Sequence, residues 1–308
     1  HLLHRALIGP RFEEMVAAEN NGLNNTLTAL LTPQAAPAPP GAWINEAAPD
    51  WGNMTEQEIQ ELVDNYLDRQ RLIILWWVQR IAVDQTTLTE PMTFFWHDHF
   101  ATNADEVFYP QAIYGQLDLM RTHSLGNFQT MALEMCTDPA MLIWLNGDGN
   151  TVDEPNENFA RELLELFTMG EGSGYTQQDV VNAARACTGY VTDGVDVFYI
   201  PQWHDNGSKT ILGQTGNWGV TELVNIIFQQ PATARHVCDK LYRWFVDDEP
   251  ADDDVEALAV TFRSNNYNVT PVLQQIMASA HFYDPTFRGS IIKDGVEMYA
   301  GNVRSLHA

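Results

Sequence analysis

Two histidines separated by one residue are the first feature of this sequence that could carry chemistry. His97 and His99 lie in the aromatic run FFWHDHF at 94–100. They could share a metal ion where the backbone is extended, because alternate side chains of a strand point the same way. On a regular helix they would lie about 200° apart and could not both reach one ion. The pair therefore predicts metal ligands if the helix that begins near Pro91 breaks near Asp98, and buried, hydrogen-bonded histidines otherwise.

A second feature is a row of acidic side chains around an arginine in the segment NENFARELLE, residues 156–165. At about 100° per residue, one arc of a helix carries Glu157, Arg161, Glu162 and Glu165. The row is either a solvent-facing stripe of ion pairs or a set of carboxylates that faces a cleft. In a cleft, the glutamates would be candidates for a metal ligand or a general base. Arg161 would then stabilise an oxyanion or bind an acidic group of the substrate.

The loop before this helix has the ligand spacing of an EF-hand calcium loop. Position six of the loop is Thr151, where an EF-hand has glycine. The loop predicts either a Ca²⁺ site or an ordinary acidic loop. Side chains that carry oxygen fall at positions one, three, five, nine and twelve, which are Asn146, Asp148, Asn150, Glu154 and Glu157.

A His-Asp pair, His204-Asp205, is the fourth candidate. It could orient an imidazole or complete a metal shell with His97 and His99. The same residues could equally form a turn with the Asn-Gly that follows them. Three tryptophans are candidates to line a sugar-binding cleft beside such a site: Trp96, Trp203 and Trp218.

Composition limits the kind of partner. The chain has 308 residues, 41 of them acidic and 16 basic, which gives a formal net charge of −25. Such a surface repels phosphate backbones, so nucleic acids and anionic membranes are poor candidate partners. No apolar run approaches the roughly 18 residues that a membrane-spanning helix needs. Three cysteines, Cys136, Cys187 and Cys238, allow at most one disulfide and leave its presence open.

Helical periodicity dominates the elements that must position these side chains. Thr55 and Glu58 form a capping-box signature for a long helix over 56–83. We expect a mainly α-helical protein organised as one domain over residues 1–308. Residues 32–50, rich in proline and alanine, are expected to cross the surface in an extended form. Alternating apolar residues predict a small inserted β-hairpin near 190–216.

Several of these segments together resemble one family. The matching pieces follow in order along nearly the whole chain: His1-Leu2-Leu3 with Arg5, residues 95–100, Asp138-Pro139-Ala140-Met141, residues 156–170, Thr188-Gly189-Tyr190, and His204-Asp205 with Lys209. In this arrangement the chain resembles the bacterial "domain of unknown function 1800" family. Asp98 departs from the family pattern, which usually has asparagine between the two histidines. The resemblance implies an exported protein, often encoded beside a sulfatase-like partner, with no settled activity.

Three functions follow as hypotheses. The first is a secreted hydrolase of an extracellular polymer or ester that depends on a divalent metal ion, with His97, His99, His204 and Asp205 as candidate ligands. The second is a metal-free, glycan-active enzyme that uses two carboxylates of the 157–165 row. The third is a scaffold without catalysis that docks the sulfatase-like partner.

Overall fold

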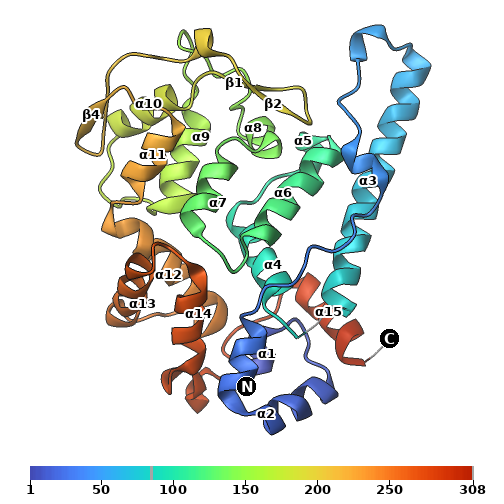
Figure 1. The fold of residues 1–308 in the computed structure, drawn as a ribbon, viewed down its shortest axis with the longest axis vertical. Coiled ribbons are helices and arrows are strands. Elements are labelled where there is room, and N and C mark those ends of the chain that lie inside the picture. The colour runs from blue at the N-terminus through green and yellow to red at the C-terminus, as the bar shows by residue number, and fades with distance from the viewer. Residues whose placement is uncertain (84–85, 307–308) are drawn as a thin grey trace.

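The computed structural model describes residues 1–83 and 86–306, and it is mainly α-helical as predicted (Figure 1). The first half contains α1 (Leu2–Ala6), α2 (Phe12–Leu30), α3 (Glu56–Val83), α4 (Thr89–His99), α5 (Ala104–Val107), α6 (Pro110–Thr122), α7 (Phe128–Met135) and α8 (Pro139–Trp144). The second half contains α9 (Glu157–Glu162), α10 (Gln177–Ala186), α11 (Val220–Ile227), α12 (Pro231–Phe245), α13 (Asp252–Ser264), α14 (Val269–Ala278) and α15 (Gly295–Leu306). None of the described helices is long and apolar enough to cross a membrane.

Short turns and strands complete the chain. A π-helical turn, η3 (Leu163–Thr168), follows α9 directly. Single 3-10 turns lie at η1 (Ala42–Asn45), η2 (Trp51–Asn53), η4 (Pro201–Trp203), η5 (His281–Tyr283) and η6 (Pro285–Phe287). Within residues 32–50 the only helical turn is η1. Ala38 lies in the non-helical part of this segment, and its carbonyl accepts a hydrogen bond from the Trp76 indole of α3.

The predicted hairpin insertion contains two hairpins instead of one. Strand β1 (Tyr190–Thr192) pairs with β2 (Val197–Tyr199), and β3 (Lys209–Ile211) pairs with β4 (Gln214–Gly216), both antiparallel. Each has a glycine with positive φ at its turn, Gly194 in the first hairpin and Gly213 in the second. Because glycine adopts this conformation without steric cost, each pair of strands can reverse within a few residues.

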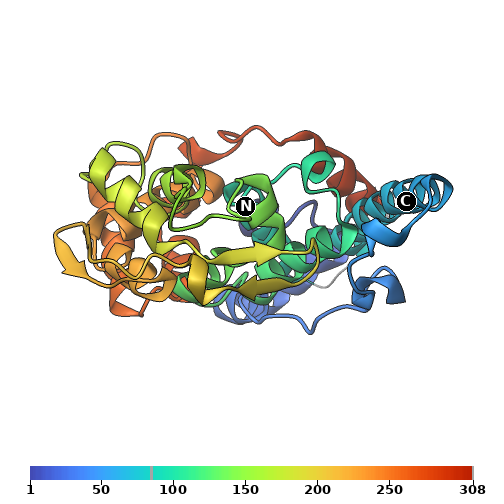
Figure 2. The same ribbon diagram turned by 90° about the horizontal axis from the view of Figure 1, so that it is seen from above.

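The helices are arranged around a large apolar core that α4, α7, α9 and α12 all enter. Trp96 of α4 is fully buried there, where its ring stacks on Phe128 and its indole nitrogen donates to the Ser124 carbonyl. Trp96 therefore cannot line a sugar cleft. In both views α3 lies on the opposite side of the molecule from α10 and α11, with α15 packed against it (Figure 2). Cys136, Cys187 and Cys238 are all buried free thiols.

One buried ion pair ties α3, α4 and α6 together. The Arg121 guanidinium donates to both carboxylate oxygens of Glu90, at 2.7 and 3.0 Å, and the Trp77 indole donates to Glu90 at 2.9 Å. The side chains of Arg121 and Glu90 are only 4% and 6% exposed. Removing either partner would leave a buried charge without its counter-ion, which costs far more than the net value of the pair.

We therefore expect Glu90→Ala to lower the free energy of unfolding by about 3–5 kcal/mol. Chemical denaturation followed by circular dichroism measures this change. Asp68→Ala is the matched control, because Asp68 pairs with Arg71 while both side chains remain 71% exposed. A loss for Glu90→Ala no larger than that of the control would contradict the expectation.

Candidate functional site

The two histidines of the FFWHDHF run do not face one site, because α4 continues through Asp98 to His99. The His97 ring packs against Trp77, with the ring centroids 5.1 Å apart. The His99 ring lies in the core, only 4% exposed, among the rings of Phe100, Phe128 and Phe167. The break near Asp98 that a shared metal ion requires is absent from this helix. His99 is therefore buried and hydrogen-bonded, as the helical alternative predicted, whereas His97 is half-buried and packs against Trp77.

The acidic-row helix changes its geometry halfway along. The sequence predicts one α-helix over 158–169, but the chain forms α9 and then widens into the π turn η3. Its Met169 N–H donates to the Leu164 carbonyl, five residues back, at 3.0 Å. Inserting a π turn redirects the carbonyls around it, and such turns occur often at functional sites.

Two carbonyls of this π turn hold histidines from other helices. The Phe167 carbonyl lies 2.9 Å from Nε2 of His99 on α4, and the Leu166 carbonyl lies 2.9 Å from Nε2 of His236 on α12. A carbonyl can only accept, so each Nε2 carries the proton and donates it. The other ring nitrogen, Nδ1, is then a bare acceptor in the neutral ring. The π turn thereby fixes the tautomer of both histidines.

His99 uses its acceptor to hold a lysine. Lys240 of α12 donates from Nζ to His99 Nδ1 at 3.1 Å and to the Leu166 carbonyl at 3.4 Å. Burial lowers the pKa of His99 well below its usual value, and the nearby Lys240 charge lowers it further. His99 is therefore a neutral imidazole that positions the Lys240 ammonium.

His99 and Lys240 lie in the wall of a pocket of about 410 Å³. The pocket is formed by α4, by the C-terminal half of α12 and by the chain that leads into α15. Its apolar wall contains Phe95, Trp244, Ile291 and Ile292. Its polar groups are Asp98, His99, Lys240, Arg243, Asp248, Asp294 and Glu297. A hollow with apolar walls and a few converging polar groups is the usual form of a small-molecule site.

Two groups of this pocket have pKa values displaced in opposite directions. Burial lowers the pKa of Lys240, although the carboxylates of Asp98 and Asp239 oppose that shift. Burial raises the pKa of Glu297, and the Asp294 carboxylate raises it further, against a hydrogen bond from the Asp294 backbone that lowers it. Both shifts bring the pKa values of the two groups closer to neutral pH, where an acid and a base exchange protons most effectively.

The acidic row itself forms a stripe of ion pairs. Arg161 bridges Glu157, at 3.0 Å, and Glu165, at 3.4 Å, and Gln177 of α10 joins Glu157 at 2.6 Å. These side chains are partly exposed. Glu162 is not one of the two carboxylates that Arg161 bridges, and its pKa is raised by burial and by the Glu165 carboxylate. The arginine thus joins two of the three candidate carboxylates, which is the first of the two arrangements that the sequence allowed.

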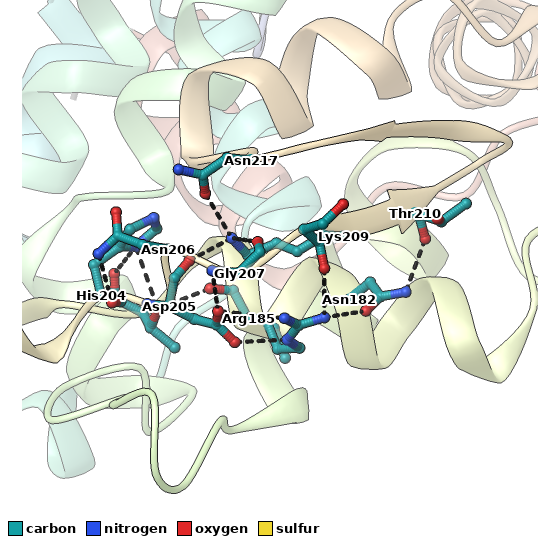
Figure 3. A network of polar contacts seen from close by, with 12 residues as sticks. Asn182, Arg185, His204, Asp205, Asn206, Gly207, Lys209, Thr210 and Asn217 are labelled. Atoms are coloured by element: carbon teal, nitrogen blue, oxygen red, sulfur yellow. Dashed lines mark hydrogen bonds and ion pairs between the residues drawn. The ribbon is translucent and has the colours of Figure 1, made fainter.

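The His-Asp pair belongs to a second polar network, on the hairpins (Figure 3). Asp205 accepts from Nε of Arg185 at 2.6 Å, and this guanidinium lowers the pKa of Asp205. Lys209 is 1% exposed and donates from Nζ to the carbonyls of Asp205 and Gly207. His204 donates from Nδ1 to the Thr188 carbonyl at 2.9 Å. The Arg185–Asp205 pair joins the hairpin segment to α10, the His204 bond joins it to the residues just after α10, and the Lys209 bonds hold the segment 205–209 together.

The predicted metal ligands His97, His99, His204 and Asp205 are not brought together. Over residues 1–83 and 86–306, no three side chains of His, Cys, Asp or Glu are grouped so that they could hold a metal ion. Both nitrogens of His99 have protein partners, and Asp205 is paired with Arg185. As arranged here these four residues do not form one ligand set, and a metal ion elsewhere stays a prediction.

In the loop with EF-hand spacing, side-chain oxygens accept hydrogen bonds from backbone amides of the loop itself and of β1. Asp148 accepts from the Thr192 N–H at 2.9 Å, and Asn150, which is 3% exposed, accepts from the Asn156 N–H at 2.8 Å. Among the other predicted ligands, Glu157 pairs with Arg161, Glu154 is exposed, and the Asn146 carbonyl accepts from the Asn156 side chain. These contacts join the loop to α9 and β1, and calcium binding stays a prediction.

Sequence reasoning missed Lys240, His236 and Glu297. One signal pointed to the first of them, because the chain has only three lysines among 16 basic residues. In a protein this poor in lysine, each one has a raised chance of an internal role, and two of the three, Lys209 and Lys240, have one. Nothing in the local pattern around His236 or Glu297 distinguishes them from ordinary helical residues.

Comparisons with known proteins identify one family. The family model described as "Protein of unknown function (DUF1800)" matches residues 1–308. No curated protein and no solved structure gives a significant match. The match confirms the resemblance drawn from the motifs and adds no activity to it.

We expect nuclear magnetic resonance to find His99 neutral, with its proton on Nε2, at pH values where a free histidine is mostly protonated. Burial disfavours the charged ring, and the Phe167 carbonyl requires a donor at Nε2. Nitrogen-15 shifts of the imidazole rings measure both properties, and His99→Gln assigns the signal. A proton on Nδ1, or titration near the pH of a free histidine, would contradict this arrangement.

Proposed function

This chain belongs to the DUF1800 family of proteins of unknown function, and we propose that it is a hydrolase that cleaves an ester bond in the pocket between α4, α12 and α15. One observation supports this proposal above the others. Glu297, with a raised pKa, and Lys240, with a lowered pKa, line the same pocket. A carboxylate base and an ammonium acid, each tuned toward neutrality, are the two groups that ester hydrolysis needs.

The reaction divides between these two residues. The Glu297 carboxylate takes a proton from a water molecule as the water oxygen bonds to the ester carbonyl carbon, and the carbonyl π electrons move onto the carbonyl oxygen to give a tetrahedral oxyanion. When this oxyanion collapses to re-form the carbonyl, the carbon–oxygen bond to the alcohol breaks, and the Lys240 ammonium gives a proton to the departing oxygen. Proton exchange with solvent returns both groups to their starting states. His99 is a positioning residue here, because its Nδ1 holds the Lys240 ammonium at the pocket wall.

The apolar wall of the pocket suits the carbon skeleton of an ester. Phe95 and Trp244 supply rings on the helices, and Ile292, on the segment that precedes α15, is 92% exposed. Export from the cell, and an extracellular polymer as the bearer of the ester, are part of this proposal. They rest on the family resemblance and on the acidic, lysine-poor surface, which tolerates salty surroundings through charge screening.

We expect hydrolysis of ethyl butyrate, whose alkoxide leaving group must be protonated as it departs, to give a bell-shaped dependence of kcat/KM on pH. Activity rises as Glu297 loses its proton and falls as Lys240 loses its own, so the active form lies between the two pKa values. The acid limb should lie above the pH at which an ordinary glutamate titrates. Lys240→Arg should lower kcat/KM and remove the alkaline limb, because a guanidinium does not lose its proton in this range and cannot give one to the departing oxygen.

Substitution separates these roles from a merely structural effect. Glu297→Gln and Lys240→Met should each lower kcat/KM by about 100-fold or more. Arg71→Met is the control, because Arg71 lies on α3 with its side chain 71% exposed and does not line the pocket. Equal activity in Lys240→Met and the control, in proteins with unchanged melting temperatures, would overturn the proposal.

Metal-dependent hydrolysis, expected from the sequence, is the rival proposal. On the acid–base mechanism we expect full activity to persist after dialysis against a chelator. Metal content by mass spectrometry, on protein purified without chelators, is measured beside it. Loss of activity together with loss of one near-stoichiometric transition metal would favour the rival. Calcium retained in His97→Ala/His99→Ala protein would instead point to the loop at 146–157.

A scaffold role is the second candidate, and the network in Figure 3 supports it. Lys209 and Asp205 are buried and fully engaged with their own chain, as expected of polar groups that fix a fold. On this hypothesis the motif residues shape a surface that docks a sulfatase-like protein. A stable complex with such a protein, together with no hydrolysis of any ester, would favour it over the enzyme. The metal-free glycan mechanism is weaker, since Arg161 neutralises both Glu157 and Glu165.

A further inference from the structure

A second hollow lies at the hairpin end of the molecule. It has a volume of about 400 Å³ and separates the β1–β2 hairpin from α7 and α11. None of the residues that line it also lines the pocket of Lys240 and Glu297. Its lining residues are Leu133, Glu134, Thr137, Tyr190, Val197 and Tyr199, together with the first two residues of α11.

Two tyrosine rings form one wall of this groove. Tyr190 and Tyr199 are direct cross-strand partners, so their side chains leave the hairpin on the same face. Their ring centroids are 5.1 Å apart and the planes are inclined by 49°. Tyr199 is 49% exposed. Tyr199 therefore presents aromatic surface to the groove, while Tyr190 is partly buried and packs against the core beside it.

The backbone beneath the rings is shaped for this arrangement. Gly189 has φ +97°, and a Cβ there would lie 3.0 Å from the Tyr199 ring and 3.2 Å from Cβ of His204. Only glycine allows the ring to lie so close to the chain at this conformation. The position of Tyr199 is thus fixed by its surroundings.

Hydrogen-bonding groups face the rings from α7 and α11. The Glu134 carboxylate is 49% exposed and is held by His123 Nε2 at 2.8 Å. Thr221 adds an exposed hydroxyl, and the hydroxyl of the half-buried Thr137 donates to the Glu134 carbonyl at 3.4 Å while its oxygen remains an acceptor. The phenol of Tyr190 is a neutral donor, because burial raises its pKa to about 12. An aromatic wall opposite fixed polar groups is suited to a ligand that has an apolar face and a polar edge.

We propose that this groove binds one pyranose ring of a neutral saccharide. The axial C–H bonds of a pyranose carry slight positive charge and stack on the negative face of a tyrosine ring. Its hydroxyls lie at the edge of the ring, where Glu134, Thr137 and Thr221 can exchange hydrogen bonds with them. The net charge of −25 and the Glu134 carboxylate disfavour sulfated and uronic sugars. This binding is independent of the hydrolase proposal.

The test is calorimetric titration of the full chain with four neutral hexasaccharides, cellohexaose, xylohexaose, chitohexaose and maltohexaose, and with oligogalacturonate as the anionic probe. We expect at least one neutral probe to bind and the anionic probe not to bind. Tyr199→Ala should weaken binding by about tenfold or more, which corresponds to about 1.4 kcal/mol, because it removes the ring on which the sugar stacks. Phe198→Ala is the matched control, since Phe198 is 50% exposed on the opposite face of the same strand.

Binding that falls in Tyr199→Ala and stays within twofold in Phe198→Ala would support the proposal. Absence of binding by all neutral probes at millimolar concentration would overturn it. Equal loss in both variants, equal retention in both, or preference for oligogalacturonate would also overturn it. Tyr199 is half exposed, so its replacement should leave the melting temperature unchanged, which thermal denaturation checks. Failure here would leave the ester hydrolysis and its Lys240 dependence unaffected.

Discussion

Two carbonyl oxygens redirected by the π turn η3 hold together the parts of the molecule on which the pocket depends. The Phe167 carbonyl accepts a hydrogen bond from His99 of α4, and the Leu166 carbonyl accepts one from His236 of α12. Lys240 of α12 then donates hydrogen bonds to His99 Nδ1 and to the Leu166 carbonyl. Because Leu166 and Phe167 lie in the last turn of the helical segment, their carbonyls have no partner within it and can accept from other helices. The end of this segment therefore lets three separate helices share one polar core.

A buried lysine needs such a site because an ammonium group loses its hydration there. Lys240 recovers part of that loss through its two acceptors and the nearby carboxylate of Asp98. Lys209 recovers it differently, through backbone carbonyls and Asn217, and is enclosed more completely. The difference in exposure matters for function. Lys209 can only stabilise the fold, whereas Lys240 reaches a pocket and can exchange a proton with a ligand.

The sequence was sufficient for most of the fold and for little of the site. The boundaries of the helix at 56–83 follow from its cap and its periodicity. The π turn was missed, because a one-residue insertion in a helix leaves the apolar pattern of Leu163, Leu164 and Phe167 almost intact. The partners of His99 lie 68 and 141 residues away, so only tertiary packing could reveal them.

The charge of the protein gives the proposed chemistry a direction. An ester is uncharged and can enter a pocket in a chain of net charge −25 without electrostatic cost. Its hydrolysis releases a carboxylic acid that ionises at neutral pH, and three carboxylates of the pocket, Asp98, Asp248 and Asp294, then repel it. A neutral saccharide at the tyrosine groove would meet no such repulsion. The same surface charge that argues against anionic partners would thus favour departure of the product over its retention.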